Sequence, residues 1–583
     1  MTRNTARKWG AAAAAAALGA LYLLAARATP VGAAEDDALQ LLLARSLRRG
    51  VFAFPDGTPA NDPLPGFAAL LALPAWLADP RWDALKGLSL LSAAAVVFLT
   101  WKLARRFLDE RWSLVAAGLT ALNPLTATYS ALILPDLPFL ALSLFLFDRM
   151  AEPGFAASPL MVAAAATATL LRPHGAWLAA CLGLGIAVSK GPRKAARFAV
   201  PALLPLALWT VRNRLLTGSG SGYLLNMRAE TAALAVPRVA ALHAAGLLAA
   251  MGGDGLLTAG RLLPLAGLTA AGAAALALAA AGAVRLLKKN DPRAFSVAAY
   301  AVCLCAQHLL WMPLEPRYIL PLLPLAWILI LASASSRSKS ALAPALAFVL
   351  LAAPALPLDW ALAAPGLKGP GRFQPATMAW LAANVPPDAR IQTLEPQTVG
   401  LLTGRDAELP DFGAGERDAW LAEALDRRVS YVHVVSSFPA GGFFTPAMRR
   451  VVVRSESWCR STPYAREVYR DAAEGTAVFR IEHPHPEIYL RAWAIFADAA
   501  TAARRGEPAA RVRARADQAV ALEPRLALAW TLRGLTARDP AERRLLLLTA
   551  AKLDPTSEMI RAALDGAPPE EKQARPSLLR SPL

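Results

Sequence analysis

The feature that most constrains the fold of this chain is a series of long apolar runs that ends near residue 358. Up to that point the runs alternate with short basic loops, whereas residues 359–583 have the composition of a soluble protein. A bilayer core about 30 Å thick requires about 20 apolar residues for each spanning helix. The 583 residues, 56% of them hydrophobic, therefore predict a mainly α-helical, polytopic membrane domain over residues 1–358, followed by soluble regions.

We expect eleven membrane-spanning helices, and several of them are short for a bilayer core. They are predicted at residues 9–28, 86–104, 112–130, 136–149, 155–171, 174–189, 198–211, 262–284, 294–312, 318–334 and 340–358. If the loops alternate between the two sides, one side receives 18 Lys and Arg residues in short loops. Because cytoplasmic loops carry such an excess, the N-terminus is predicted to be cytoplasmic and the C-terminal region extracytoplasmic, in the inner (plasma) membrane.

This distribution of charge also argues against a nucleic-acid-binding protein, although the formal net charge is +18. Many of the Lys and Arg residues lie in the short loops, where topology accounts for them. Three of the four cysteines lie in apolar runs and only Cys459 lies in the soluble part, so no disulfide framework or cysteine metal site is expected there. The first run could alternatively be a signal peptide, since it has a basic start and small residues near 33–34; its removal would leave the remaining topology unchanged.

Polar groups at the ends of the predicted helices gather on the extracytoplasmic side. The acidic pair Asp36-Asp37 follows the first run directly, and Asp136 opens a later helix. The other residues on this side are Arg172, His174, Arg212, Glu315, Arg317 and Tyr318. Helix ends often carry polar residues, and arginines there can simply reach toward water from the interface. The convergence of acids, arginines, a histidine and a tyrosine on one face nevertheless indicates a site.

The first extracytoplasmic loop, residues 29–85, is the longest non-spanning stretch of the membrane half. Residues 38–49 are amphipathic, with leucines at near-helical spacing and interleaved arginines, which predicts a helix lying in the membrane interface. Gly50 ends that helix, a turn follows at 54–57, and residues 66–78 are predicted to form a second interfacial helix.

This loop resembles the first external loop of the GT-C class of membrane glycosyltransferases. The bacterial relatives of the dolichyl-phosphate-mannose protein mannosyltransferases and of the lipid A aminoarabinose transferases are the most similar families. The residues that carry the resemblance are Asp36-Asp37, Gly50, Phe54-Pro55-Asp56-Gly57, Leu134-Pro135-Asp136, Arg172-Pro173-His174-Gly175, Arg212-Asn213 and Arg317-Tyr318-Ile319-Leu320-Pro321. The Asp-Asp form departs from the Asp-Glu pair of the protein mannosyltransferases, which leaves the substrate branch open.

The resemblance implies transfer of a sugar from a polyprenyl-phosphate donor to a hydroxyl of a protein, lipid or cell-envelope glycan, outside the cytoplasmic membrane. An acceptor hydroxyl benefits from a carboxylate base, and a phosphate leaving group needs cations more than a general acid. We assign Asp36 as the general base that supports direct, inverting displacement. Asp37 would orient Asp36 or the acceptor, and Asp136 would be a second acid that holds hydroxyls of the acceptor or the sugar.

Further roles in this site are assigned to basic and aromatic residues. Arg172, Arg212 and Arg317 are candidates for holding the donor phosphate, because a guanidinium can grip phosphate oxygens bidentately. The weaker substrate-binding candidates are His174, Glu315 and Tyr318.

A divalent cation such as Mg²⁺ or Mn²⁺ could bind the acids of this face through hard oxygens. The spacing of Asp36, Asp37 and Asp136 is not specific for such an ion. The His483-Pro484-His485 stretch is interpreted as a linker rather than a metal site.

The soluble part is predicted to contain two structured regions. Residues 359–485 alternate strand-like stretches (389–393, 429–435 and 476–481) with helical ones (377–384 and 417–425), which favours a small α/β domain. Residues 486–565 are helical, and the stretch at 521–524 recurs at 552–555, which resembles tetratricopeptide repeats and allows either a protein-docking surface or a packing appendage. Residues 566–583 are predicted to be a disordered tail.

Two alternatives to an enzyme stay open. A transporter or lipid flippase would also be a polytopic membrane protein, but such proteins usually have inverted repeats and broken helices near the midplane, and no internal duplication is visible. A degenerate GT-C scaffold that only binds a lipid-linked glycan is the second alternative.

Overall fold

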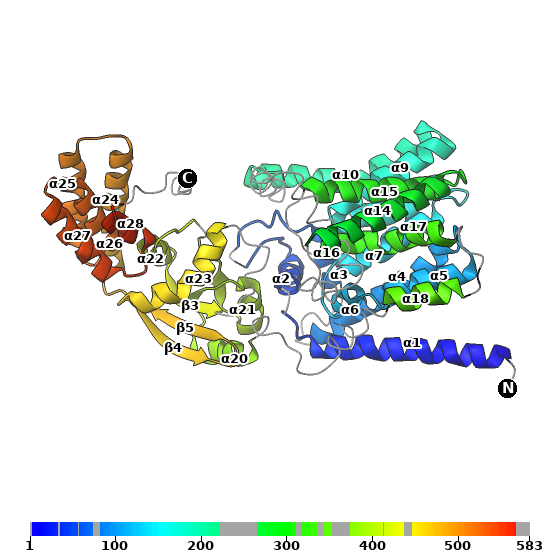
Figure 1. Ribbon diagram of the computed structural model, residues 1–583, viewed down its shortest axis with the longest axis horizontal. Coiled ribbons are helices and arrows are strands. Elements are labelled where there is room, and N and C mark those ends of the chain that lie inside the picture. Colours follow the sequence, from blue (N-terminus) through cyan, green and yellow to red (C-terminus); the bar gives the residue numbers. More distant parts are fainter. Residues whose placement is uncertain are drawn as a thin grey trace. The chain divides into compact units, whose positions relative to one another are not determined.

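The structure is a computed structural model of the 583-residue chain. It describes residues 3–32, 35–55, 57–73, 82–220, 265–310, 316–335, 340, 342–352, 374–411, 413–435 and 446–566. The chain divides into two compact units, Met1–Lys368 and Gly369–Leu583. The first unit is helical, and the second combines helices with a five-stranded sheet (Figure 1).

The first unit has a helix at each of the eleven predicted positions. Its elements are α1 (Arg3–Ala28), α2 (Asp36–Arg48), α3 (Pro65–Ala72), η2 (Trp82–Leu85), α4 (Lys86–Ala104), α5 (Glu110–Ala121), α6 (Pro124–Ser130), α7 (Asp136–Arg149), η3 (Phe155–Ala157), α8 (Pro159–Leu171), α9 (His174–Lys190), α10 (Pro192–Thr217), α14 (Leu265–Leu287), α15 (Pro292–Leu310), α16 (Pro316–Ile319), η4 (Leu320–Leu322), α17 (Leu323–Ser335) and α18 (Ala343–Ala352). This confirms the mainly helical class.

Three stretches among the described residues are long and apolar enough to cross a membrane. They are α4, α10 and the continuous stretch Arg317–Ser335. The count of eleven spans stays a prediction, because only these three stretches of the described residues meet both conditions.

One predicted helix, 112–130, is in fact two. Pro124 cannot donate a backbone hydrogen bond to the preceding turn, and it occupies the first turn of α6 instead. Asn123 caps α6 with its side chain, which accepts a hydrogen bond from the backbone N–H of Leu125 at 3.0 Å. The sequence therefore ends α5 at Ala121 and starts a new helix at Pro124.

The first external loop contains the two short helices expected of it. The amphipathic stretch forms α2, which begins at the acidic pair and is followed by Gly50 with a φ of 83°. That left-handed conformation suits glycine, which has no Cβ. The second helix, α3, ends at Ala72, and residues 74–78 of its predicted range lie outside the described residues.

Helix α7 is held at both ends by charged side chains. Asp136 starts the helix, and Asp148 lies fully buried one position before its end. The Asp148 carboxylate accepts contacts from Lys102, in the last turn of α4, at 2.8 Å and from Arg106, just after that helix, at 2.9 Å. Arg293, at the start of α15, donates to the backbone carbonyl of Asp148 at 3.1 Å. These contacts fix α7, whose opposite end carries Asp136.

The second unit is built on a sheet with strand order β2-β1-β3-β5-β4. Its strands are β1 (Arg390–Gln392), β2 (Asp406–Glu408), β3 (Val429–Val435), β4 (Ala465–Asp471) and β5 (Thr476–Ile481). Strands β2, β1 and β3 are parallel, whereas β5 is antiparallel to β3 and to β4. Strands β1, β3 and β5 match the predicted ones. Strands β2 and β4 were not predicted, because both are polar edge strands without an apolar alternation.

Nine helices of the second unit are described. They are α20 (Pro375–Asn384), α21 (Pro396–Thr403), α22 (Arg417–Asp426), α23 (Pro446–Ser461), α24 (Pro486–Arg504), α25 (Ala509–Leu522), α26 (Ala527–Thr536), α27 (Pro540–Leu553) and α28 (Glu558–Leu564). The stretch that recurs in the sequence ends two of them, α25 and α27, so it marks equivalent helix ends. Residues 567–583, most of the predicted tail, lie outside the described residues.

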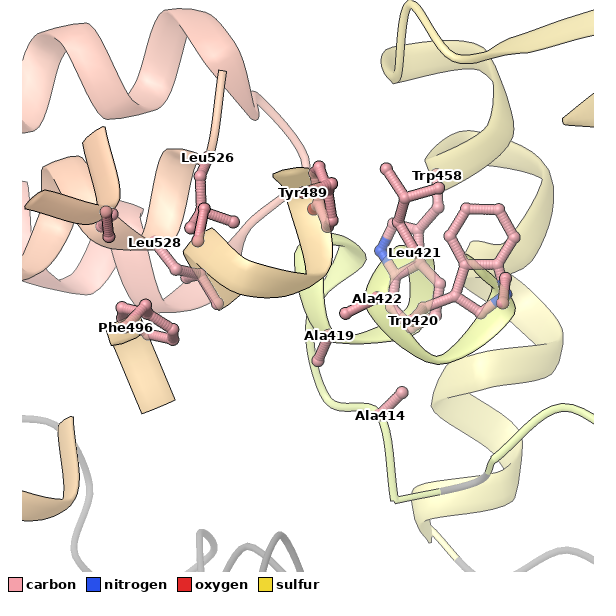
Figure 2. Packing of buried hydrophobic residues seen from close by; sticks show 14 of the residues in the cluster. Ala414, Ala419, Trp420, Leu421, Ala422, Trp458, Tyr489, Phe496, Leu526 and Leu528 are labelled. Atoms are coloured by element: carbon pink, nitrogen blue, oxygen red, sulfur yellow. The ribbon is translucent and has the colours of Figure 1, made fainter. Parts of the chain in front are cut away.

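The sheet and the C-terminal helices share one hydrophobic core. Trp420 and Trp458, from α22 and α23, are completely buried, and their rings lie 6.1 Å apart. The same cluster continues through Tyr489 of α24 to Phe496 and to Leu528 of α26 (Figure 2). The region after residue 485 is therefore packed against the α/β part rather than folded apart from it.

Candidate functional site

A cavity of about 590 Å³ lies in the first unit. Its walls come from α2, the loop before α3, the turn between α8 and α9, and the helices α7, α10, α15 and α16. The lining residues include Asp36, Gln40, Asn61, Asp62, Asp136, Arg172, His174, Trp177, Trp209, Asn213, Cys303, Gln307, Arg317 and Tyr318. Six of the nine residues predicted from the sequence thus meet in one place: Asp36, Asp136, Arg172, His174, Arg317 and Tyr318.

Two carboxylate–guanidinium pairs line the cavity. Arg317 pairs with Asp36, which lies 281 residues earlier in the chain. Arg172 pairs with Asp136, and the side chains of both are at least nine-tenths buried. The Asp36 side chain is 40% exposed, so it is the more accessible carboxylate of the two.

Tyr318 lies between the two arginines. The Arg317 guanidinium carbon lies 5.2 Å from the centre of the Tyr318 ring, and that of Arg172 lies 5.6 Å from it. These are cation–π distances. Arg317 also donates to the Tyr318 hydroxyl at 3.4 Å. The buried His174 ring lies 6.3 Å from the same tyrosine. The motif at 317–318 therefore supplies a cation and the aromatic ring that orients it.

The turn that carries Arg172 and His174 depends on close packing between α8 and α9. Arg172 follows the last residue of α8 in an extended conformation, and His174 is the first residue of α9. A Cβ at Gly175 would lie only 2.2 Å from the carbonyl oxygen of Ala168. Only glycine fits there, so this residue of the predicted turn has a steric role that places both side chains.

The two members of the acidic pair have different surroundings. Asp37 is fully buried and does not line the cavity. Its carboxylate accepts hydrogen bonds from the backbone N–H groups of Gly32 and Ala38, both at 2.9 Å. Asp37 thus fixes the start of α2, while Asp36, one position earlier on the helix, is turned toward the cavity. The orienting role assigned to Asp37 stays a prediction.

Arg212 is not a lining residue, contrary to what its motif predicts. Its guanidinium donates to the backbone carbonyl of Ala60 at 2.7 Å and to that of Phe52 at 3.2 Å. Its neighbour Asn213 donates to the carbonyl of Asn61 at 3.0 Å. Because these donors bind carbonyl groups of the loop before α3, Arg212 and Asn213 hold that loop against the end of α10. Glu315, another predicted site residue, lies outside the described residues.

Several lining residues were missed from the sequence. Gln40 lies four positions after Asp36, so the two occupy one face of α2, and this spacing could have identified it. Gln307 is a polar side chain within an apolar helix, and such a residue is itself an indication of a functional site. Asp62 belongs to the loop before α3, where nothing in the local pattern distinguishes it from an ordinary turn residue.

The described residues do not fit a divalent-cation site. No group of three or more His, Cys, Asp or Glu side chains among them could hold a metal ion. One oxygen of Asp36 and one oxygen of Asp136, which would be hard ligands, are each paired with an arginine instead.

A smaller cavity of about 240 Å³ lies in the second unit, beside Arg417 and Asp418 of α22. The two side chains are buried and joined by a contact of 2.8 Å, and Asp418 also accepts from the backbone N–H of Leu528 at 2.9 Å. Burial raises the pKa of Asp418, while the charge of Arg417 opposes that shift. Arg417 donates to the carbonyl of Leu553 at 2.6 Å as well, so this pair joins α22 to the C-terminal helices.

Solved structures similar to the chain are membrane glycosyltransferases. One is ArnT from Cupriavidus metallidurans in the apo state, with a TM-score of 0.48 and 12% identity over 82% of this chain and 98% of that one. ArnT bound to undecaprenyl phosphate has a TM-score of 0.46 and 14% identity over 81% and 98%. The Archaeoglobus fulgidus oligosaccharyltransferase in complex with Zn and sulfate has a TM-score of 0.47 and 13% identity over 69% of this chain.

These matches confirm the predicted resemblance. Both proteins are GT-C glycosyltransferases, the class to which the motifs were compared. The chain spans 64% of the length of the archaeal enzyme. No family model and no curated protein matches the chain. All three TM-scores are below 0.5, a level at which similarity by itself assigns no substrate or activity.

Proposed function

We propose that this chain transfers a sugar from a polyprenyl-phosphate donor to an acceptor hydroxyl outside the cytoplasmic membrane, with inversion at the anomeric carbon. The observation that carries the proposal is the pair of carboxylate–arginine contacts on either side of Tyr318 in one cavity. It combines an accessible carboxylate with two cations, which are the two kinds of group that displacement of a phosphate by a hydroxyl requires.

Asp36 acts as the general base in this proposal. The acceptor oxygen attacks the anomeric carbon, its proton passes to the Asp36 carboxylate, and the bond from that carbon to the phosphate oxygen breaks. The polyprenyl phosphate leaves with the bonding electron pair. Asp36 suits this role because it is the more exposed of the two paired carboxylates.

Arg317 and Arg172 hold the donor phosphate and stabilise the charge that develops on it. A guanidinium has five N–H donors, so each arginine can contact phosphate oxygens while it still faces its carboxylate. When the phosphate takes up part of the Arg317 charge, the Asp36 carboxylate becomes a better proton acceptor. Asp36 is therefore a stronger base when a donor is bound than when the cavity is empty.

The position of the cavity favours a transferase over a transporter. Its polar lining comes from helix ends, namely the start of α7, the start of α9, the end of α8 and the start of α16. A transport site would instead be expected at interrupted helices near the bilayer midplane. We place the enzyme in the inner membrane, with the cavity at the extracytoplasmic face, on the basis of the loop charges.

Transfer can be tested with the purified full chain and a labelled polyprenyl-phosphate hexose. Membranes from a strain that lacks the chain supply the unknown acceptor. We expect label to move from the donor to membrane material only with the wild-type chain, and NMR of the released product to show the opposite anomeric configuration from the donor. A product with retained configuration would exclude the single-displacement mechanism. Donor that is bound or moved across vesicles without any transfer would favour the scaffold or the transporter instead.

A further inference from the structure

Four polar atoms of the lining residues Gln40, Asp136, Trp209 and Gln307 have no hydrogen-bond partner among the described residues. Three of them are acceptors: the side-chain oxygens Oε1 of Gln40, Oε1 of Gln307 and Oδ2 of Asp136. The fourth is a donor, the indole nitrogen of Trp209. All four residues line the cavity. Burying such atoms without partners is unfavourable, so their gathering in one cavity indicates a ligand that supplies hydrogen-bond donors.

The two glutamines face the cavity from different helices. Gln40 is 5% exposed and lies one helical turn after Asp36 on α2. Gln307 of α15 shares its lining face with Cys303 and Ala306, at the i, i+3 and i+4 spacing of a helix. An amide cannot ionise, so these side chains can recognise hydroxyl groups without adding charge to the site.

The charges of the lining restrict the ligand further. Among the described residues, the lining contains three carboxylates, Asp36, Asp62 and Asp136, and two guanidiniums, Arg172 and Arg317. The arginines are already shared with the carboxylates and would also face the donor phosphate. A further carboxylate on the sugar would therefore meet like charges in a partly enclosed site, where such repulsion is strong.

We propose that Gln40 and Gln307 bind the hydroxyl groups of the donor sugar and that the cavity selects a head group without a carboxylate, such as a neutral hexose rather than a uronic acid. This inference rests on the transferase function proposed above. It assigns the arginines to the phosphate and the glutamines to the sugar, so the two sets of residues can be separated by experiment.

The test compares Gln40→Met and Gln307→Met with the wild-type full chain. Methionine keeps the length of the side chain and removes the amide. We expect each variant to lower kcat/KM for a polyprenyl-phosphate hexose by about tenfold or more, because a site built to bind hydroxyl groups loses its partners. Binding of bare polyprenyl phosphate should change by less than about threefold, since this ligand has no sugar for the amides to contact.

Gln518→Met is the matched control, because Gln518 is an exposed residue of α25 in the second unit. It should behave as the wild type with both ligands. The wild-type chain should also use the hexose donor at least about tenfold better than the corresponding uronic acid donor, given the repulsion between like charges.

The outcomes separate this inference from the function on which it rests. Wild-type activity combined with unchanged hexose kinetics in both glutamine variants would overturn the sugar-binding role alone. A preference for the uronic acid would overturn the charge selection. Failure of the wild-type chain to transfer either sugar would remove the proposed function and this inference with it. If the glutamine variants bound bare polyprenyl phosphate as much more weakly as they used the hexose donor, the glutamines would be assigned to the carrier instead of the sugar.

Discussion

Arg317 forms an ion pair with Asp36 across 281 residues of sequence. The pair joins the start of α16 to the start of α2, and it places a guanidinium beside the more exposed of the two paired carboxylates. Because Arg317 also contacts Tyr318 through its ring and its hydroxyl, the guanidinium has a defined orientation before any donor binds.

Replacing this arginine should affect the donor more than the fold. We expect Arg317→Gln to lower transfer by about 100-fold or more, the usual loss when a donor to a developing oxyanion is removed. Arg317→Lys should restore only part of the rate, since a lysine cannot form the bidentate contact. Steady-state kinetics with varied donor concentration would measure both effects. Full activity of Arg317→Gln would contradict the assignment of Arg317 to the donor phosphate.

Arg212 should behave differently from Arg317, although both were predicted to bind phosphate. Arg212→Ala removes hydrogen bonds to the carbonyls of Phe52 and Ala60, each worth about 1.5–3 kcal/mol for a charged donor. The loop before α3 should become more susceptible to limited proteolysis, whereas binding of bare polyprenyl phosphate should stay within about threefold of wild type if no phosphate contact is lost.

Arg214→Ala is the control for this experiment, because Arg214 lies two positions further along α10 and is exposed. A loss of phosphate binding in Arg212→Ala that matches the loss in Arg317→Gln would show that the arginine reaches the donor after all.

The turn between α8 and α9 should tolerate no side chain at Gly175. A methyl group there would overlap the carbonyl of Ala168, and overpacking of this kind typically costs about 1–3 kcal/mol. Gly175→Ala should therefore lower both thermal stability in detergent and activity, because Arg172 and His174 flank the displaced backbone. Gly87→Ala in α4 is the matched change, since a Cβ there meets no atom within 4 Å. Equal melting temperatures for the two variants would contradict the steric role.

A buried carboxyl group makes the second unit sensitive to pH. Burial raises the pKa of Glu395 to about 7 from an ordinary value of 4.5. The folded state therefore binds this proton more tightly than the unfolded state. Its contribution to stability is complete below the unfolded pKa, and it is lost as the pH rises toward and through 7. The loss is on the order of 3 kcal/mol.

Glu395→Gln should remove this pH dependence, because an amide has the same shape and no charge. The variant should gain stability over the wild type at pH 8 and little at pH 4. Hydrogen exchange of the second unit in the full chain would measure the difference. A wild-type unit whose protection stays constant between pH 4 and pH 8 would contradict the raised pKa.

The sequence was sufficient to locate most of the site because its residues lie at helix ends within short motifs. Asp36, Asp136, Arg172 and Arg317 each begin or follow a helix, and hydrophobic length determines where such ends fall. The pairing of Asp36 with Arg317 could not be derived in the same way, because it depends on how distant helices pack.

Two other features were also decided by packing. Adjacent side chains on a helix point about 100° apart, so which of Asp36 and Asp37 reaches the cavity depends on how α2 is oriented about its own axis. The contacts of Arg212 depend on where the loop that carries Ala60, 152 residues earlier in the chain, packs against α10. In the second unit the short edge strand β2 was missed because its three residues carry no apolar pattern.

The assignment of Asp36 as the general base is tested most directly by the rate of a single turnover in Asp36→Asn. The donor is pre-bound to the purified full chain, membranes that lack the chain supply the acceptor, and Asp388→Asn in the exposed surface of the second unit serves as the matched control. Asparagine keeps the shape but cannot take a proton, so we predict a fall of about 100-fold to 10,000-fold with donor binding retained, and no change in the control. Transfer by Asp36→Asn at the wild-type rate would contradict the assignment of Asp36 as the base.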